Sequence, residues 1–345
     1  MVQLMENGLA KLAFAMIEEN AGPQVSREYA MRFLDEAILQ SAQSAHYVEI
    51  YGDNVQFYNQ PLQEYFAAVE LKSVGLSHVL FPTEYENAGF MFSNPIEKKW
   101  DRVIQVFAGI ERKDAVIREI QQFDPVLAAS IIGSGINVSD ALIDELIADQ
   151  IERLGDEVAN MKMGAVTALR YLGKITTPLL IEVLKKSDNP YARAGAALVL
   201  EKTADVAATS VLISRLTDTQ PAWLFGVMVC DYVENALKAI DSLEAKEAVK
   251  NWADMLLPHL DSEDVLVRAR AALKLGRIGN SIAVPKLINL LNDENYTVNF
   301  VHNERICDYA VEALEEIGTS EATRAAEEWR RQEKSKNDNI NPYKH

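Results

Sequence analysis

The sequence predicts an all-α protein, an α-solenoid of stacked helix pairs behind a small helical domain with a winged-helix-like β-hairpin. The segment 230–252 recurs at 307–329, with ten of 23 aligned positions identical. An Ala-Leu pair also recurs at intervals of 29, 39, 36 and 41 residues, ending at Ala313-Leu314. Helix pairs repeating at this period are typical of solenoids, because a single pair cannot bury both faces of its helices.

The first 58 residues are predicted to form the winged-helix-like unit. Apolar residues between Leu9 and Ile17 follow helical spacing, and Ser26 is placed to cap a second helix that continues through Ile38. The pattern then alternates in 48–57 around Gly52-Asp53-Asn54, which predicts a β-hairpin.

A helical arm region is predicted for residues 59–135. Asn94-Pro95 is expected to begin one of its helices, and Asp124-Pro125 another. The repeat array is predicted for residues 136–334, as five helix pairs and a terminal helix. The polar residues 335–345 are predicted to be a disordered tail.

Composition limits the classes of function. The 345 residues carry a net charge of −17, which disfavours nucleic acid as a partner because phosphate backbones are bound mainly by Lys and Arg. The same charge argues against a DNA-repair enzyme on such a scaffold. Two cysteines cannot form a disulfide framework. No segment predicts a membrane span or signal peptide, so we expect a cytoplasmic protein that does not bind membranes.

The repeats themselves resemble a known family. Val267-Arg268 and the residues that follow, through Leu275-Gly276 to Ile278-Gly279, are similar to HEAT repeats of the bilin-lyase-like type. This resemblance implies a scaffold or ligand-sensing module that recognises another macromolecule. It leaves an alternative open, a HEAT-type phycobilin lyase that binds a tetrapyrrole.

A second resemblance lies before the repeats. Residues 55–68, which include Gln63-Glu64-Tyr65-Phe66-Ala67-Ala68, and residues 100–110 are similar to the region behind the nucleotide-binding core of NACHT-type STAND NTPases. The family's histidine is Asn59 here, and the sequence has no phosphate-binding loop. The resemblance implies a signalling system in which a separate NTPase subunit is a partner.

Neither the cysteines nor the histidines form a catalytic or metal-binding pattern, and we predict no enzyme activity, cofactor or metal. Cys230 and Cys307 occupy the same repeat position, which favours buried packing over covalent chemistry. Arg193 and Arg268 begin second helices, where we expect them to pair with acids such as Asp188 or Asp261.

Two long loops within the repeats are the predicted contact site for a protein partner. They lengthen the same position of the 77-residue unit and carry large side chains. The alternative is that these side chains fold back onto the solenoid. The predicted partner-binding residues are Trp223, Phe225, Tyr296, Phe300, His302 and Arg305.

Overall fold

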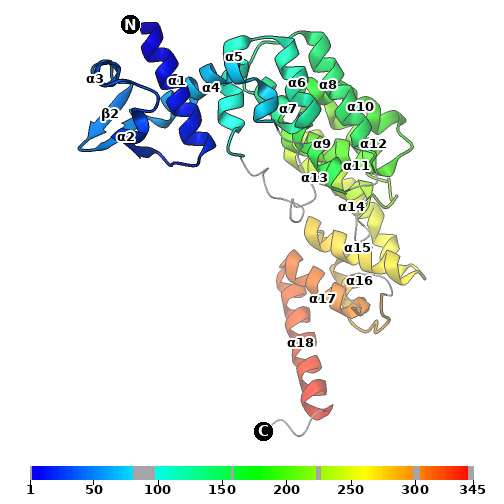
Figure 1. Ribbon diagram of the computed structural model, residues 1–345. Helices are drawn as coiled ribbons and strands as arrows, with labels where there is room; N and C mark the ends of the chain where they lie inside the picture. Colours follow the sequence, from blue (N-terminus) through cyan, green and yellow to red (C-terminus); the bar gives the residue numbers. More distant parts are fainter. Residues whose placement is uncertain (1, 81–97, 157–158, 223–226, 298–303, 341–345) are drawn as a thin grey trace. The chain divides into compact units, whose positions relative to one another are not determined.

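The computed structural model describes residues 2–80, 98–156, 159–222, 227–297 and 304–340 (Figure 1). Helix dominates it, as predicted, with one small sheet among the described residues. The chain divides into two compact units, 1–176 and 177–345. This division falls inside the expected repeat array instead of at its start.

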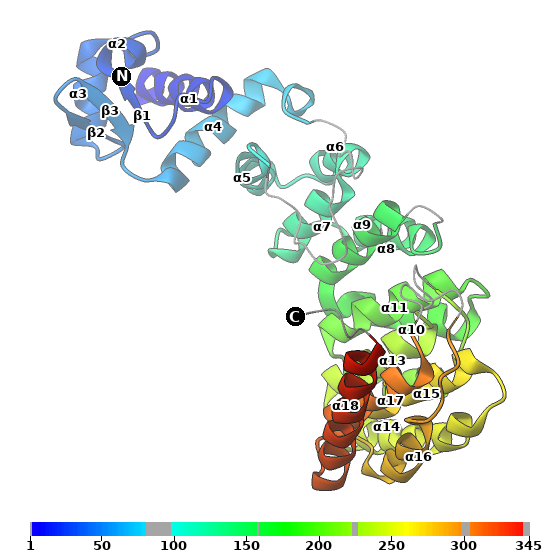
Figure 2. The same cartoon turned by 90° about the horizontal axis from the view of Figure 1, so that it is seen from below.

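The first unit begins with a three-stranded sheet and its helices, seen from two sides in Figures 1 and 2. The strands lie in the order β1-β3-β2 with antiparallel pairing, so the predicted hairpin is present and a third strand, β1, joins it. The bounds are α1 (Val2–Glu18), β1 (Gln24–Ser26), α2 (Arg27–Ala30), α3 (Glu36–Ser44), β2 (Val48–Tyr51), β3 (Asn54–Phe57) and α4 (Gln60–Val74).

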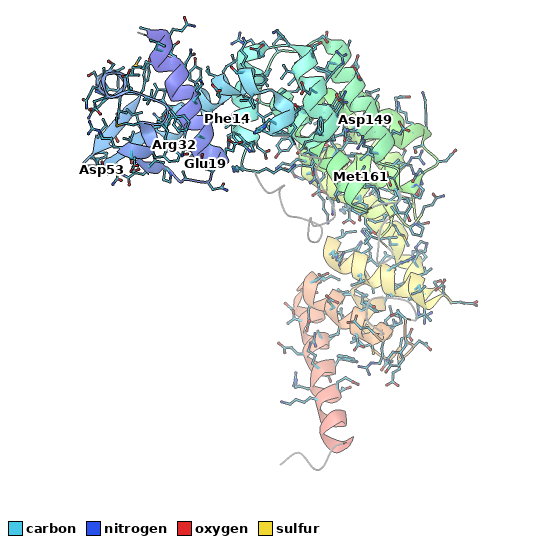
Figure 3. The ribbon with its side chains drawn as sticks, viewed as in Figure 1. Phe14, Glu19, Arg32, Asp53, Asp149 and Met161 are labelled. Carbon is cyan, nitrogen blue, oxygen red and sulfur yellow. The ribbon has the colours of Figure 1, made fainter. Side chains whose placement is uncertain are left out.

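The helix predicted from Ser26 through Ile38 is two helices. Ser26 caps α2 as expected, but Asp35 caps α3 by accepting a hydrogen bond from the Ile38 amide at 2.8 Å. The intervening turn buries Leu34 against Gly8 of α1, where a Cβ would lie 2.3 Å from a Leu34 methyl carbon. The helix is therefore interrupted by a turn that buries the apolar side chain of Leu34. Close by, Arg32 pairs with Glu19 at the end of α1 (Figure 3).

The remaining helices of this unit are η1 (Leu76–His78), α5 (Asp101–Glu111), α6 (Asp114–Phe123), α7 (Pro125–Gly133), α8 (Asp140–Arg153), α9 (Ala159–Leu172) and η3 (Gly173–Thr176). Asp124-Pro125 begins α7 as predicted. Helix α5 begins at Asp101, whose carboxylate accepts a hydrogen bond from the Lys98 amide. Asn94-Pro95 lies outside the described residues.

The second unit alternates first and second helices of successive pairs. The second helices stack on one another, α11 on α13 and α15 on α17. The bounds are α10 (Thr177–Lys186), α11 (Pro190–Thr203), η4 (Val206–Ala208), α12 (Thr209–Ser214), α13 (Val229–Ile240), α14 (Leu243–Leu256), η6 (Leu257–Asp261), α15 (Val265–Ile278), η7 (Ser281–Ala283), α16 (Val284–Leu290), α17 (Ile306–Ile317) and α18 (Ser320–Ile340). Helix α18 continues past 334, so the described part of the expected tail is helical.

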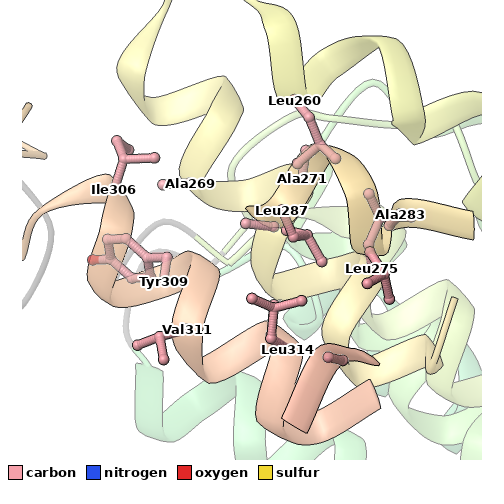
Figure 4. Close-up of a cluster of buried hydrophobic side chains, with 14 of the residues drawn as sticks. Leu260, Ala269, Ala271, Leu275, Ala283, Leu287, Ile306, Tyr309, Val311 and Leu314 are labelled. Carbon is pink, nitrogen blue, oxygen red and sulfur yellow. The ribbon is translucent and has the colours of Figure 1, made fainter. Parts of the chain in front are cut away.

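The residues that resemble HEAT repeats have structural roles in α15. Leu275 lies in a cluster of buried apolar side chains with Leu287 and Leu314 (Figure 4). Gly276 lets α17 approach, since a Cβ there would lie 2.6 Å from the Ala313 Cα. Gly279 ends the helix with a φ of +73°, a conformation that glycine adopts without strain.

Candidate interaction site

Both predicted contact loops are closed at their base in the same way. In the first loop, between α12 and α13, an isolated antiparallel bridge joins Pro221 to Met228. In the second, between α16 and α17, the equivalent bridge joins Tyr296 to Arg305. Four of the predicted contact residues lie outside the described residues, namely Trp223, Phe225, Phe300 and His302.

A buried ion pair holds the base of the first loop. Arg193, on α11, donates from Nε to Asp218 at 2.7 Å and from Nη2 to the same carboxylate at 3.2 Å. It also donates to the Ser187 carbonyl oxygen and to the Gln220 side chain, each at 2.8 Å. The side chains of Arg193 and Asp218 are only 5% and 7% exposed, so this pair ties the loop to the preceding helix pair.

The second loop has the same arrangement. Arg268 donates to Asp293 at 2.9 Å and to the Ser262 carbonyl oxygen at 2.6 Å. The prediction of a structural Arg–Asp ladder is confirmed, but the predicted acids Asp188 and Asp261 were wrong. Each arginine contacts only backbone oxygen in its own inter-helix turn and reaches forward to the acid of the next turn.

Sequence reasoning missed these two acids although a signal for them was present. Arg193 and Arg268 are 75 residues apart, and so are Asp218 and Asp293. The offset between Cys230 and the equivalent cysteine beyond the second loop is 77. The second loop is therefore two residues longer than the first. An alignment of the sequence with itself at a constant offset of 77 does not place the two arginines, or the two aspartates, at the same position.

The backbone of each cysteine is hydrogen-bonded to the aspartate of one ion pair. The Cys230 amide donates to the Asp218 carbonyl oxygen at 2.9 Å, and the Cys307 amide donates to that of Asp293 at 3.0 Å. Both side chains are buried, as predicted. Burial, followed by the nearby Asp231 carboxylate, raises the pKa of Cys230 to about 12. Burial likewise raises the pKa of Cys307 to about 11.

An aspartate completes each loop by capping the helix that follows it. Asp231 accepts a hydrogen bond from the Met228 amide at 2.7 Å, and Asp308 accepts one from the Arg305 amide at 3.0 Å. Each of these aspartates also pairs with a cation. Asp231 pairs with Lys274, and Asp308 pairs with the Arg305 side chain. The aspartates in the repeated Cys-Asp-Tyr segment therefore fix the helix starts.

The cation beside each capping aspartate also lies over a tryptophan. Lys274 is 5.5 Å from the centre of the Trp252 ring, and Arg305 is 5.7 Å from that of Trp329. Lys274 further pairs with the buried Glu234 at 2.7 Å. The repeated tryptophans thus pack against a cation at both positions, even though the cations come from different places in the repeat.

The two described members of the predicted contact set differ in their surroundings. Tyr296, one of the two residues of the bridge, is 58% exposed. The Arg305 side chain is 23% exposed and bonds to Asp308 at 2.9 Å and to Glu333 of α18 at 3.1 Å. Within the second loop, Thr297 is buried. Of these, Tyr296 presents the larger free surface, and a partner contact for either residue stays a prediction.

Within the described ranges, no group of three or more His, Cys, Asp or Glu side chains could hold a metal ion. No helix in those ranges is long and apolar enough to cross a membrane. The described part of the site consists of anchored loops, Arg–Asp ion pairs and helix caps.

Comparison with known proteins identifies the repeats. A family model for HEAT repeats matches residues 253–337. These residues are HEAT repeats. The match begins where the buried apolar cluster of the last helices begins, at Ala253. No curated protein matches the sequence.

Two solved structures are similar at a distance. The complex of CpcE and CpcF of phycocyanin lyase from Nostoc sp. PCC7120 is 20% identical with a TM-score of 0.29, and the match covers 69% of this chain and 96% of that one. An engineered protein is 16% identical with a TM-score of 0.31, and the match covers 94% of this chain and 82% of that one.

Proposed function

We propose that this chain is a non-catalytic protein-interaction module whose contact surface is formed by the two loops of the second unit. The observation that carries the proposal is the repeated anchoring of these loops. Each is closed by a β-bridge and tied by an Arg–Asp pair, the buried side chains of Arg193 and Asp218 in the first loop and the part-buried pair Arg268–Asp293 in the second. Tyr296, which forms the second bridge with Arg305, is exposed.

Anchoring of this kind favours binding for a physical reason. A loop must lose conformational freedom when a partner orders it, and a loop fixed at its base has less to lose. Tyrosine and tryptophan are the side chains that most often dominate interface energies, and loops on a rigid scaffold commonly carry them. The sequence supplies Trp223 in the first loop and Tyr296 in the second.

The lyase alternative has two features to test, the repeat segment and the cysteines. The Val267–Gly279 segment that resembles bilin-lyase-like repeats is accounted for by an ion pair, a close helix approach and a helix end. The cysteines are poor candidates for covalent chemistry, because a nucleophilic cysteine requires a lowered pKa and both pKa values are raised. The raised pKa values disfavour Cys230 and Cys307 as attachment residues for a tetrapyrrole.

The resemblance of residues 55–68 to NACHT-type proteins leads us to propose a separate NTPase subunit of a signalling system as the first partner to test. Asn59 caps α4 here, and Phe66 is buried against Tyr47 and Phe57, so this segment also has a packing role. Helix α3 contains no Lys or Arg, which disfavours DNA as the ligand of the winged-helix-like unit.

Site-specific photo-crosslinking in the native cell tests the proposal. A photoreactive phenylalanine analogue replaces Tyr296, and the matched control replaces Leu243, which is 86% exposed at the start of α14. We expect a discrete crosslinked protein at position 296 that is absent at 243. The same bands at both positions, or none at 296, would contradict the proposal.

A further inference from the structure

Two surface grooves occupy equivalent places in the second unit. The first has a volume of about 440 Å³ and lies where α10 and α12 end, with Lys186, Arg215 and Asp218 among its lining residues. The second has a volume of about 590 Å³ and is lined by Asp261, Leu290 and Asp293, among others. Each residue of the second set follows its counterpart by 75 positions, so the grooves are two copies of one structural feature.

The two grooves carry opposite charge. Among the described residues, the first is lined by four basic side chains and two acidic ones, Asp188 and Asp218. The second is lined by one basic side chain, Lys286, and three acidic ones, which are Asp261, Asp293 and Glu294. A net positive lining is notable on a chain of net charge −17.

The neighbouring carboxylates do not neutralise all of the positive charge of the first groove. Lys185 and Lys186 share one carboxylate, that of Glu182, and their side chains are 54% and 77% exposed. Arg215 donates to the Lys185 carbonyl oxygen and lies 3.9 Å from Asp218, which Arg193 already engages. The four basic side chains of the groove thus outnumber the three nearby carboxylates, Glu182, Asp188 and Asp218, by one.

The fold does not require these cations. Basic residues are common at helix C-termini, where they interact favourably with the helix dipole. The second groove, however, keeps the equivalent Arg268–Asp293 ion pair and the equivalent loop closure with Asp261 and Leu290 in the places of Lys186 and Arg215. The repeat thus serves as an internal control, and the basic residues call for another explanation.

We infer that the first groove binds an acidic segment of the protein partner, and that the second groove does not. This inference rests on the proposed function and names the chemistry of the partner. Charges are screened within about 8 Å at physiological ionic strength, so a short acidic segment senses the groove more than the distant acidic surface. A nucleic acid would extend beyond the groove over that acidic surface, which opposes it.

Fluorescence anisotropy of a fluorescein-labelled hexaglutamate peptide with the full chain tests this. We expect saturable binding that weakens with salt and becomes at least tenfold weaker in the double variant Lys186→Asp/Arg215→Leu, which introduces residues that the second groove already accommodates. If that variant melts early, Lys185→Gln/Lys186→Gln alters only exposed side chains and should also weaken binding.

The reverse exchange sharpens the test. The double variant Asp261→Lys/Glu294→Thr gives the second groove residues of the first, and we expect it to bind more of the peptide. Unchanged binding in the first-groove variants, or tighter binding of a hexathymidylate than of the peptide, would overturn the inference. Loss of the groove inference leaves crosslinking at Tyr296 unaffected, so its failure is distinguishable from failure of the proposed function.

Discussion

Replacing Asp218 with Ala leaves the Arg193 guanidinium buried without its carboxylate. The two hydrogen bonds from Arg193 are lost, those of 2.7 and 3.2 Å, and so is the bond from the Gln220 amide at 3.4 Å, while the bonds from Arg193 to Ser187 and to the Gln220 side chain remain. Removing one partner of a buried ion pair costs about 3–5 kcal/mol, and the 5% exposure of the arginine allows little relief by water. We expect this cost to be felt first in the closure of the first loop.

Hydrogen exchange measured by mass spectrometry reports that closure locally. The amides of Val229 and Cys230 bond to Gln220 and Asp218 across the loop base. At about 1.4 kcal/mol for each tenfold change, their protection should fall roughly 100-fold or more in Asp218→Ala. Asp188→Ala, a change at an exposed acid, should leave these amides unchanged.

A double replacement provides the sharper check. Arg193→Met/Asp218→Leu removes both charges and fills the space with apolar side chains, which is often neutral or stabilising for a buried pair. It should restore most of the lost protection. Unchanged exchange of the Cys230 amide in Asp218→Ala would refute the view that the ion pair holds the loop.

Two further predictions concern the interior of the repeats. An unfolded cysteine ionises near pH 9, whereas the pKa of folded Cys230 is about 12 and that of Cys307 about 11. The folded state therefore retains protons that the unfolded state loses, and stability should fall as the pH rises above 9. In denaturant titrations at pH 8 to 11, Cys230→Ala and Cys307→Ala should each flatten this fall; an unchanged slope in both variants would contradict the assignment. Gly276→Ala should lower the free energy of unfolding by about 1–3 kcal/mol, because the new Cβ forces α15 and α17 apart. Gly109→Ala should not lower the melting temperature, because the nearest atom to a Cβ there, in Ile136, is 3.8 Å away.

The helical repeats could be predicted because their signals are local and recur. Ala-Leu pairs such as Ala313-Leu314 mark second helices, and Asp124-Pro125 carries its own cap. What failed depended on contacts between distant residues. The break before α3 depends on Leu34 packing against Gly8, which no periodicity reveals.

The candidate site shows the same division. The position of the loops and the burial of Cys230 followed from the repeat, but the partners of Arg193 and Arg268 did not. Each arginine reaches an acid 25 residues ahead, and the helices between them set that distance. The opposite charges of the two grooves arise the same way, from side chains on different helices that only folding brings together.

The measurement that tests the central claim most directly is a comparison of stability and partner capture for one loop variant. The variant carries Trp223→Ser, Phe225→Ser, Tyr296→Ser and Phe300→Ser. If the loops are a contact surface, the melting temperature of the variant stays within about 2 °C of that of the parent chain. Both chains also carry a photoreactive residue in place of Val301, and the protein that the parent chain crosslinks is no longer captured by the variant. If the side chains fold back as packing, stability instead falls by about 3–5 kcal/mol or more, as for emptied core sites, and the claim is wrong.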